Sequence, residues 1–110
     1  MKPTLLLYPA GDIAAAKKLF GVLLGTEPYA DAPYYVGFRV DDLEIGLAGT
    51  QSAGAVAYWD VDDLEGRLQE LVDAGWQAEQ AITPVGGGMR VATVKDANGN
   101  VVGLRSVSGV

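Results

Sequence analysis

The sequence contains no cysteine and no histidine among its 110 residues. Without cysteine there is no thiol nucleophile, no disulfide and no thiolate metal site. Without histidine there is no Ser-His-Asp triad and no imidazole ligand for a metal. Any metal ion would need a site of carboxylates and carbonyls, which suits Mg²⁺ or Ca²⁺ better than Zn²⁺ or iron.

An excess of positive charge, long apolar runs and the features of a signal peptide are also lacking. The net charge of −6 argues against nucleic-acid binding, which needs a basic surface. The chain has no run of about 18 apolar residues that could span a membrane. The N-terminus, "MKPTLLLYPAGD", lacks the apolar stretch and cleavage site of a signal peptide. We therefore expect a cytoplasmic protein with no nucleic-acid or membrane partner.

What the chain does have is an apolar content of 49%, enough for a packed core. Two segments show helical periodicity, Asp12–Leu24 and Asp63–Ala74. Asp12 is a candidate N-cap for the first, and Asp62 with Glu65 is a candidate capping box for the second. The predicted apolar stripes are Ile13, Ala16, Phe20, Leu23 and Leu24 in the first helix, and Leu64, Leu68, Leu71 and Val72 in the second.

Two hairpins follow the two helices. In "YYVGFRVDDLEIGLA" a turn at Asp41-Asp42 pairs Val40 with Leu43. In "MRVATVKDANGNVVGLRS" a loop over Asp96–Gly99 would place Ala92 opposite Gly103 and Arg90 opposite Arg105. Further strands are expected at about Thr4–Tyr8, Ala55–Val61 and Ala78–Ile82.

The order strand, helix, hairpin therefore occurs twice, which indicates an internal repeat. Module one covers about residues 1–48, a linker covers about 49–54, and module two covers about 55–110. We expect an α+β domain in which two β-α-β-β-β modules share one curved mixed sheet. The helices would cover its outer face, and the other face would curl into a cleft.

The chain resembles the vicinal-oxygen-chelate superfamily. Three features carry the resemblance: the paired modules, the segment "VDDLEGRLQELVDAGW" and the segment "GGGMRVATVKDANGNVVGL". This superfamily comprises glyoxalase I, bleomycin-resistance proteins and extradiol dioxygenases. The resemblance covers almost the whole chain. The segment "DANGNVVGL" is similar to the usual ending D-P-D-G-N-x-x-E-L, with Ala97 in place of proline and Gly103 in place of glutamate.

In metal-dependent members of this superfamily each module supplies two metal ligands. The resemblance assigns these positions to Leu5, Gly46, Val56 and Gly103, none of which has a side chain that binds a metal. We therefore expect no metal and no other cofactor. The two glycines indicate either a cleft left open at its floor or packing gaps in a twisted sheet.

Strand alternation predicts which other side chains face the cleft. They are Tyr35, Arg39, Glu44, Tyr58, Asp60, Arg90 and Arg105. Arg39 and Glu44 would oppose each other and form either a cross-strand ion pair or part of a ligand site. Arg90 and Arg105 would repel each other unless Asp60 or an anionic ligand lay between them, or both tips reached solvent.

Three functions remain open at this point. The first is a homodimeric small-molecule binder of the bleomycin-resistance type, which sequesters an antibiotic-like or aromatic ligand without metal chemistry and without catalytic residues. The second is a glyoxalase-like or dioxygenase-like lyase or isomerase that uses Glu44 and Asp60, with or without a displaced metal site. The third is a partner-binding module with no function in the cleft.

Overall fold

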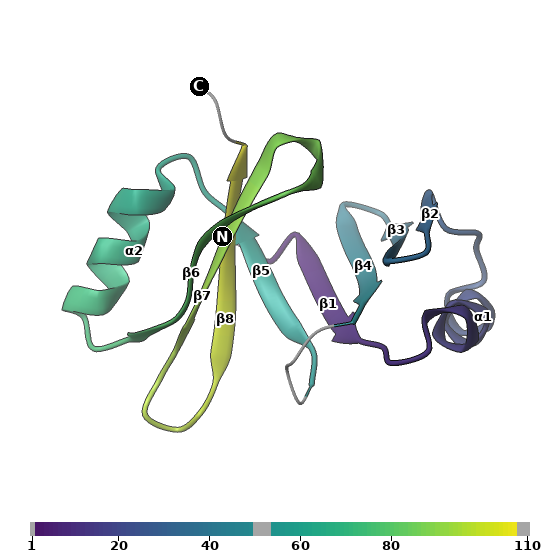
Figure 1. The fold of residues 1–110 in the computed structure, drawn as a ribbon, viewed down its shortest axis with the longest axis horizontal. Helices are drawn as coiled ribbons and strands as arrows, with labels where there is room; N and C mark the ends of the chain where they lie inside the picture. The colour runs from purple at the N-terminus through teal and green to yellow at the C-terminus, as the bar shows by residue number, and fades with distance from the viewer. Residues whose placement is uncertain (1, 50–53, 108–110) are drawn as a thin grey trace. The chain divides into compact units, whose positions relative to one another are not determined.

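Each half of the chain forms a four-stranded mixed sheet with one helix, as a computed structural model shows (Figure 1). The structure describes residues 2–49 and 54–107, so most of the expected linker, residues 50–53, lies outside the described residues. One compact unit is Pro3–Val56, and the other consists mainly of the chain from Ala57 onwards. We call these the first and the second module.

The two modules repeat the same order of elements. The first contains β1 (Leu5–Pro9), α1 (Ile13–Leu24), β2 (Ala30–Ala32), β3 (Tyr35–Val40) and β4 (Leu43–Ala48). The second contains β5 (Val56–Asp60), α2 (Leu64–Asp73), β6 (Gln77–Val85), the short 3₁₀ turn η1 (Gly86–Gly88), β7 (Met89–Lys95) and β8 (Val101–Val107). The predicted α+β class and the repeated β-α-β-β-β plan are confirmed. A cleft shared by the modules stays a prediction.

The strand order is also repeated. In the first module it is β2-β3-β4-β1, with β1 parallel to β4 and the other pairs antiparallel. In the second it is β6-β7-β8-β5, with β5 parallel to β8. Each helix connects the first strand of its module to the strand at the opposite edge of that sheet, and two antiparallel steps then lead to the last strand, which lies parallel to the first.

Helix α1 begins and ends where the sequence predicts. The Asp12 carboxylate accepts a hydrogen bond from the Ala15 amide, and Gly25 ends the helix with a φ of 67°. The stripe is confirmed except at Leu23, whose side chain is 74% exposed. Leu23 and Leu24 are adjacent and differ by about 100° around the helix axis, so both cannot face the sheet.

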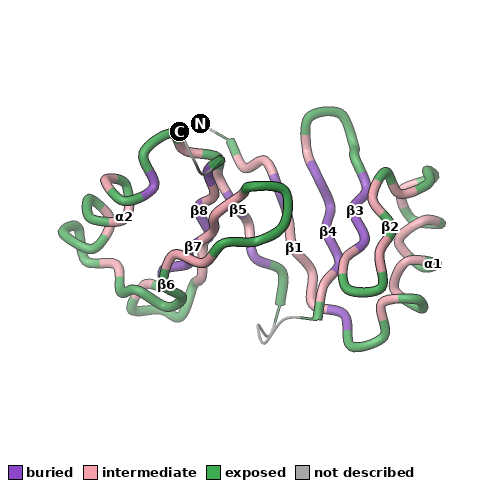
Figure 2. The backbone as a smooth tube through the Cα atoms, turned by 45° about the horizontal axis from the view of Figure 1, so that its top comes forward, coloured by how far each residue is buried: buried purple, intermediate pink, exposed green. Residues whose placement is uncertain are grey.

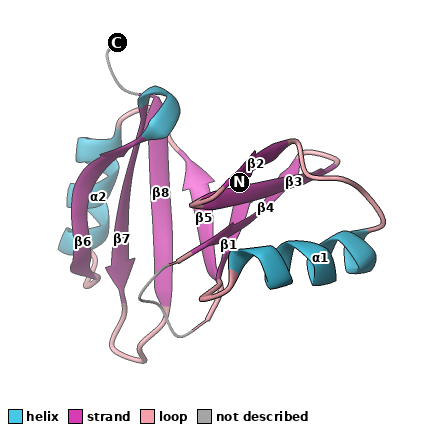
Figure 3. Ribbon diagram, turned by 45° about the vertical axis from the view of Figure 1, so that its right-hand side comes forward, coloured by secondary structure: helices cyan, strands magenta, loops and turns pink. Residues whose placement is uncertain are grey.

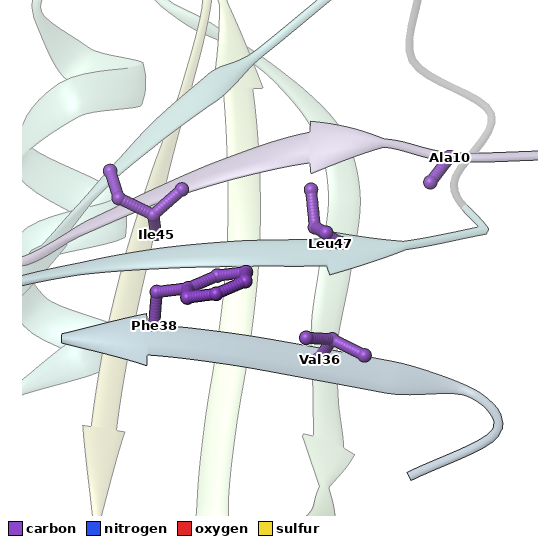
Figure 4. Packing of buried hydrophobic residues seen from close by; sticks show 5 residues of the cluster. All are labelled: Ala10, Val36, Phe38, Ile45 and Leu47. Carbon is purple, nitrogen blue, oxygen red and sulfur yellow. The ribbon is translucent and has the colours of Figure 1, made fainter. Parts of the chain in front are cut away.

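The core of the first module lies between α1 and one face of the sheet. Val36 and Phe38 of β3 pack with Ile45 and Leu47 of β4, and Ala10 joins them after β1 (Figure 4). The predicted register of this hairpin is confirmed, since Val36 pairs with Leu47 and Phe38 with Ile45. Figure 2 shows the buried positions of this module concentrated in β3 and β4. The opposite face is therefore available for a site.

Helix α2 packs against the second sheet in the same way (Figure 3). Leu64, Ala92 and Leu104 form its buried core with Trp59 and Leu68 beside them. The N-cap is Asp63, whose carboxylate accepts a hydrogen bond from the Gly66 amide, and not Asp62 as predicted. Among the described residues, neither helix is long and apolar enough to cross a membrane.

Two strands differ from the sequence prediction. A short strand, β2, precedes the first hairpin, and the Tyr29 amide just before it donates to the Gly37 carbonyl at 2.9 Å. Its three residues are too few to show periodicity. Strand β6 extends beyond the expected range of Ala78–Ile82. Shifts in its register with β7 interrupt the alternation of side chains that marks a strand, so the sequence pattern did not indicate its full length.

The register of the second hairpin is one residue away from the prediction. Thr93 pairs with Gly103, and Arg90 pairs with Ser106 instead of Arg105. The loop includes Asn100, because the Asp96 carboxylate accepts hydrogen bonds from the Asn100 amide and side chain. A shift of one residue moves every side chain of β7 to the other face of the sheet relative to β8.

This loop predicts a pH dependence. Hydrogen bonds from the side chain and then the backbone of Asn100 hold the pKa of Asp96 below its usual value of 3.8. The stabilisation is therefore present above that value and is lost as the pH falls through the folded-state pKa. We expect Asn100→Ala to raise the pKa of Asp96 towards the usual value in an NMR titration. An unchanged pKa in the variant would contradict the proposed role of Asn100.

Candidate ligand-binding site

The face of the first sheet that points away from α1 carries a cluster of polar and aromatic side chains. Its members are Tyr29, Tyr35, Arg39 and Glu44, which we call the Glu44 cluster. Three of the four were predicted from strand alternation. Tyr29 enters from the chain just before β2.

Glu44 lies at the centre of this cluster, with 6% of its surface exposed. The Tyr29 hydroxyl donates a hydrogen bond to its Oε2 at 2.5 Å, and the Tyr35 hydroxyl donates to the same atom. A carboxylate loses its water when it is buried, and such donors compensate for that loss. The two hydroxyls also fix the orientation of the carboxylate on the sheet.

Two glycines make room for the tyrosine rings. A Cβ added at Gly37 would lie 2.9 Å from Cε1 of Tyr29, and one added at Gly46 would lie 2.6 Å from the Tyr35 hydroxyl. A side chain at either glycine would therefore require the tyrosine beside it to move. The space above Gly46 is filled by Tyr35, which favours the packing interpretation of this glycine over a cleft left open at its floor.

Arg39 lies at the outer edge of the cluster. Its register opposite Glu44 is confirmed, and its guanidinium Cζ lies 4.6 Å from the centroid of the Tyr29 ring. This distance is typical of a cation–π contact, which is worth about 0.5–1 kcal/mol at an exposed site. Arg39 thus covers the Tyr29 ring.

In the second module, Tyr58 and Gly103 repeat the contact between a ring and a glycine. They are direct partners across β5 and β8. A Cβ at Gly103 would lie 2.3 Å from Cδ2 and from Cε2 of Tyr58. The space that a family glutamate would enter at Gly103 is therefore occupied by the tyrosine ring, and the floor is filled here too.

Two polar side chains of the second sheet lie near Tyr58. The Thr93 hydroxyl donates to the Glu79 carboxylate, and Thr93 is buried. Burial is the main cause that raises the pKa of Tyr58 above its usual value, and the negative charge of Glu79 raises it further. Tyr58 is thus held as a neutral phenol.

Asp60 and Arg105 are neighbours on the same face. They are register partners, and Arg105 Nε donates to Asp60 Oδ1 at 2.6 Å. The Asp60 side chain is 52% exposed, so it lacks the buried environment that would favour a role as a general base. Asp60 therefore neutralises the charge of Arg105.

Arg90 does not lie on the predicted face. With the corrected register it turns towards α2, where its two terminal nitrogens donate to the Glu65 carboxylate at 2.7 and 3.1 Å. This contact lowers the pKa of Glu65. The predicted repulsion between Arg90 and Arg105 was therefore wrong, and Arg90 leaves the set of candidate site residues.

The four positions at which the resemblance places metal ligands do not fit a metal ion. Leu5 and Val56 are buried apolar residues, and the spaces above Gly46 and Gly103 are filled by tyrosine rings. Within the described part of the chain, no three acidic side chains lie close enough together to hold a metal. These four positions therefore present no side-chain oxygen, nitrogen or sulfur atom that could coordinate a metal ion.

Three site residues were missed by the sequence reasoning: Tyr29, Glu79 and Thr93. Tyr29 lies outside any periodic segment, so the alternation of side chains gave no signal for it. Glu79 precedes a shift in the register of β6. Thr93 was assigned to the other face because of the incorrect loop length. Asn100 beside Asp96 was the available signal for the longer loop.

No protein-family model and no curated protein match the sequence. Solved structures do match. An NAD-dependent benzaldehyde dehydrogenase from Legionella pneumophila is 17% identical with a TM-score of 0.80, covering 94% of this chain and 98% of that chain.

Two further structures connect the fold to the expected superfamily. A glyoxalase/bleomycin resistance protein/dioxygenase superfamily member from Vibrio splendidus 12B01 is 19% identical with a TM-score of 0.67, covering 93% of this chain and 96% of that chain. A methylmalonyl-CoA epimerase from Mycobacterium tuberculosis is 14% identical with a TM-score of 0.78, covering 98% of this chain and 89% of that chain.

The chain has the vicinal-oxygen-chelate fold. The expectation drawn from the paired modules is confirmed in this respect. At such low identities the likeness extends to the fold and not to activity. What this example of the vicinal-oxygen-chelate fold does must therefore be argued from its own side chains.

The contact between Tyr58 and Gly103 predicts the effect of one added methyl group. We expect Gly103→Ala to destabilise the protein by about 1–3 kcal/mol in denaturant unfolding, because the new Cβ must displace the ring. Gly11→Ala is the matched control, since a Cβ there meets nothing within 4 Å. In the background Tyr58→Leu the cost of Gly103→Ala should shrink. Equal costs in both backgrounds would contradict the contact.

The environment of Tyr58 predicts a late phenol titration. Its raised pKa means that its contribution to stability is present below about pH 10 and is lost as the pH rises through the folded-state pKa. An ultraviolet titration of the five tyrosines should show a late-ionising phenol that is missing from Tyr58→Phe. Glu79→Gln should lower its pKa in part. Loss of the late phenol in Tyr34→Phe instead would show that the assignment is wrong.

Proposed function

We propose that this protein binds a small aromatic molecule without metal chemistry, as a sequestering protein of the bleomycin-resistance type. The fold supports this proposal, because it is shared with a glyoxalase/bleomycin resistance protein/dioxygenase superfamily member. The side chains at the four family ligand positions support binding in place of metal catalysis. We also propose a homodimer, and the exposed apolar side chains of Leu19, Val22 and Leu23 on α1 support a protein contact there.

The observation that carries the proposal is the Glu44 cluster. A buried carboxylate with two phenol donors is costly to build, because each charged group must be desolvated and then compensated. It lies on the sheet face opposite α1, beside the exposed Tyr29 and Arg39, so a ligand would reach it by moving these two side chains aside. The first module is therefore the proposed binding module.

The charges near the cluster favour a neutral ligand. The sequence analysis placed three arginines on one face and left an anionic ligand between Arg90 and Arg105 as one alternative. Arg90 instead binds Glu65, and Arg105 binds Asp60. Arg39 lies over the Tyr29 ring, and beside it the buried Glu44 carboxylate repels anions. A neutral planar molecule fits this site better than an acid.

A second candidate function is a metal-independent lyase or isomerase with Glu44 as its general base. Burial of Glu44 on the proposed ligand face favours it, whereas Asp60 is half exposed and held by Arg105. The methylmalonyl-CoA epimerase shares the fold, so this fold supports isomerase chemistry in at least that protein. Recovery of an unchanged ligand after prolonged incubation, followed by mass spectrometry, separates binding from turnover.

A thermal-shift screen tests the proposed function. The panel consists of antibiotics, neutral aromatic metabolites and divalent metal salts. A ligand at 100 times its dissociation constant should stabilise the fold by about 2.7 kcal/mol, which raises Tm by several degrees. We expect such a shift from a neutral aromatic compound and a much smaller one in Glu44→Gln. Glu70→Gln, on the exposed face of α2, is the matched control and should respond as the wild type does.

Two outcomes would overturn the proposal. The first is stoichiometric binding of a divalent metal that Glu44→Gln abolishes. The second is a ligand shift of equal size in the wild type, Glu44→Gln and Glu70→Gln, because it would place binding away from the Glu44 cluster.

A further inference from the structure

The side chain of Tyr29 lies in a slot on the first sheet that other residues build. Gly37 forms the floor, since a Cβ there would meet the ring at 2.9 Å. Arg39 covers the ring at 4.6 Å. Glu44 Oε2 accepts the hydroxyl at 2.5 Å. Tyr29 itself comes from outside β3 and β4, the strands that provide these three contacts.

Each of the three contacts recognises a different property of a phenol. A glycine admits a flat ring close to the backbone. A guanidinium attracts the negative face of an aromatic ring. A buried carboxylate accepts a hydrogen bond and rejects an acid that would bring a second negative charge. A toluene ring would satisfy the first two properties and fail the third.

Tyr29 is more exposed to solvent than two of the residues that build the slot. Its side chain remains 53% exposed, whereas Glu44 and Gly37 are buried. Its amide is fixed to the Gly37 carbonyl, so the side chain can rotate out while the backbone stays in place. Tyr35 still donates to Glu44 when Tyr29 leaves, so the carboxylate keeps one donor.

The geometry points to a phenol-binding slot in which Tyr29 is the resident occupant that a hydroxyaromatic ligand displaces. This inference rests on the proposed function and narrows its ligand class to neutral phenols. Tyr29 competes with the ligand, so the affinity of the wild type is lower than that of the emptied slot. The hydroxyl of the ligand takes the place of the Tyr29 hydroxyl at Glu44.

The experiment removes the Tyr29 side chain from the slot and adds a small aromatic compound in its place. The probe is p-cresol, which has the shape of a tyrosine side chain, and toluene is its analogue without the hydroxyl. We expect p-cresol to bind Tyr29→Ala roughly ten- to hundred-fold more tightly than toluene, because a hydrogen bond to a charged acceptor is lost with the hydroxyl. Calorimetry and thermal shift measure both ligands. Tyr29→Ala/Glu44→Gln should lose most of this discrimination.

Tyr34→Ala is the matched control. Tyr34 is nearby in the chain and 78% exposed, and its removal should create no response to p-cresol. The inference is overturned if Tyr29→Ala binds p-cresol and toluene equally or binds neither, or if Tyr34→Ala responds to the same extent as Tyr29→Ala.

A second variant keeps the test decisive if Tyr29→Ala does not fold. Tyr29→Phe retains the ring and loses the competing hydroxyl, so p-cresol should bind it roughly tenfold more tightly than the wild type. Equal affinities overturn the inference. A positive panel screen with no preference for phenols leaves the proposed function standing and removes this inference. If no compound of the panel binds the wild type but p-cresol binds Tyr29→Ala, the slot is supported and the proposed function is not.

Discussion

The close contact of tyrosine rings with glycines is the constraint on which the rest of this structure depends. It occurs between Tyr58 and Gly103 and between Tyr35 and Gly46. The two glycines lie in the last strands of their modules, whereas Tyr58 comes from the parallel neighbour β5 and Tyr35 from the antiparallel neighbour β3. A glycine in a strand loses packing and conformational entropy. The ring restores the packing, because it covers the backbone that the glycine leaves bare. The glycine and the tyrosine therefore act as one unit in each sheet.

This constraint links the fold to the proposed function. The glycines stand where the resemblance places metal ligands, and the tyrosines use that space. In the first module the Tyr35 hydroxyl also reaches Glu44 and holds the carboxylate in place. The glycines thus leave room for an aromatic and polar surface. Under the proposed function, this surface recognises an aromatic ring.

The sequence predicted what depends on local pattern. The caps at Asp12 and Gly25, the first hairpin and the positions of Tyr35 and Glu44 on one face all follow from short-range rules. The sequence did not predict the partners of Arg90, because Asn100 lengthened a loop and reversed the face of β7. It also did not predict that tyrosines would fill the glycine positions. Strand alternation assigns a face but does not determine how far a ring extends across it.

The ring-current shift of the glycine Hα protons tests the central claim most directly. A ring that lies against a proton over its face moves the NMR signal upfield. The account predicts a strongly upfield Hα signal for Gly103, whose Cβ position lies against the body of the Tyr58 ring, and an ordinary signal for Gly11, which has nothing within 4 Å of its Cβ position. Replacing Tyr58 with leucine should return the Gly103 signal to the ordinary range. An ordinary Gly103 signal in the wild type would contradict the account.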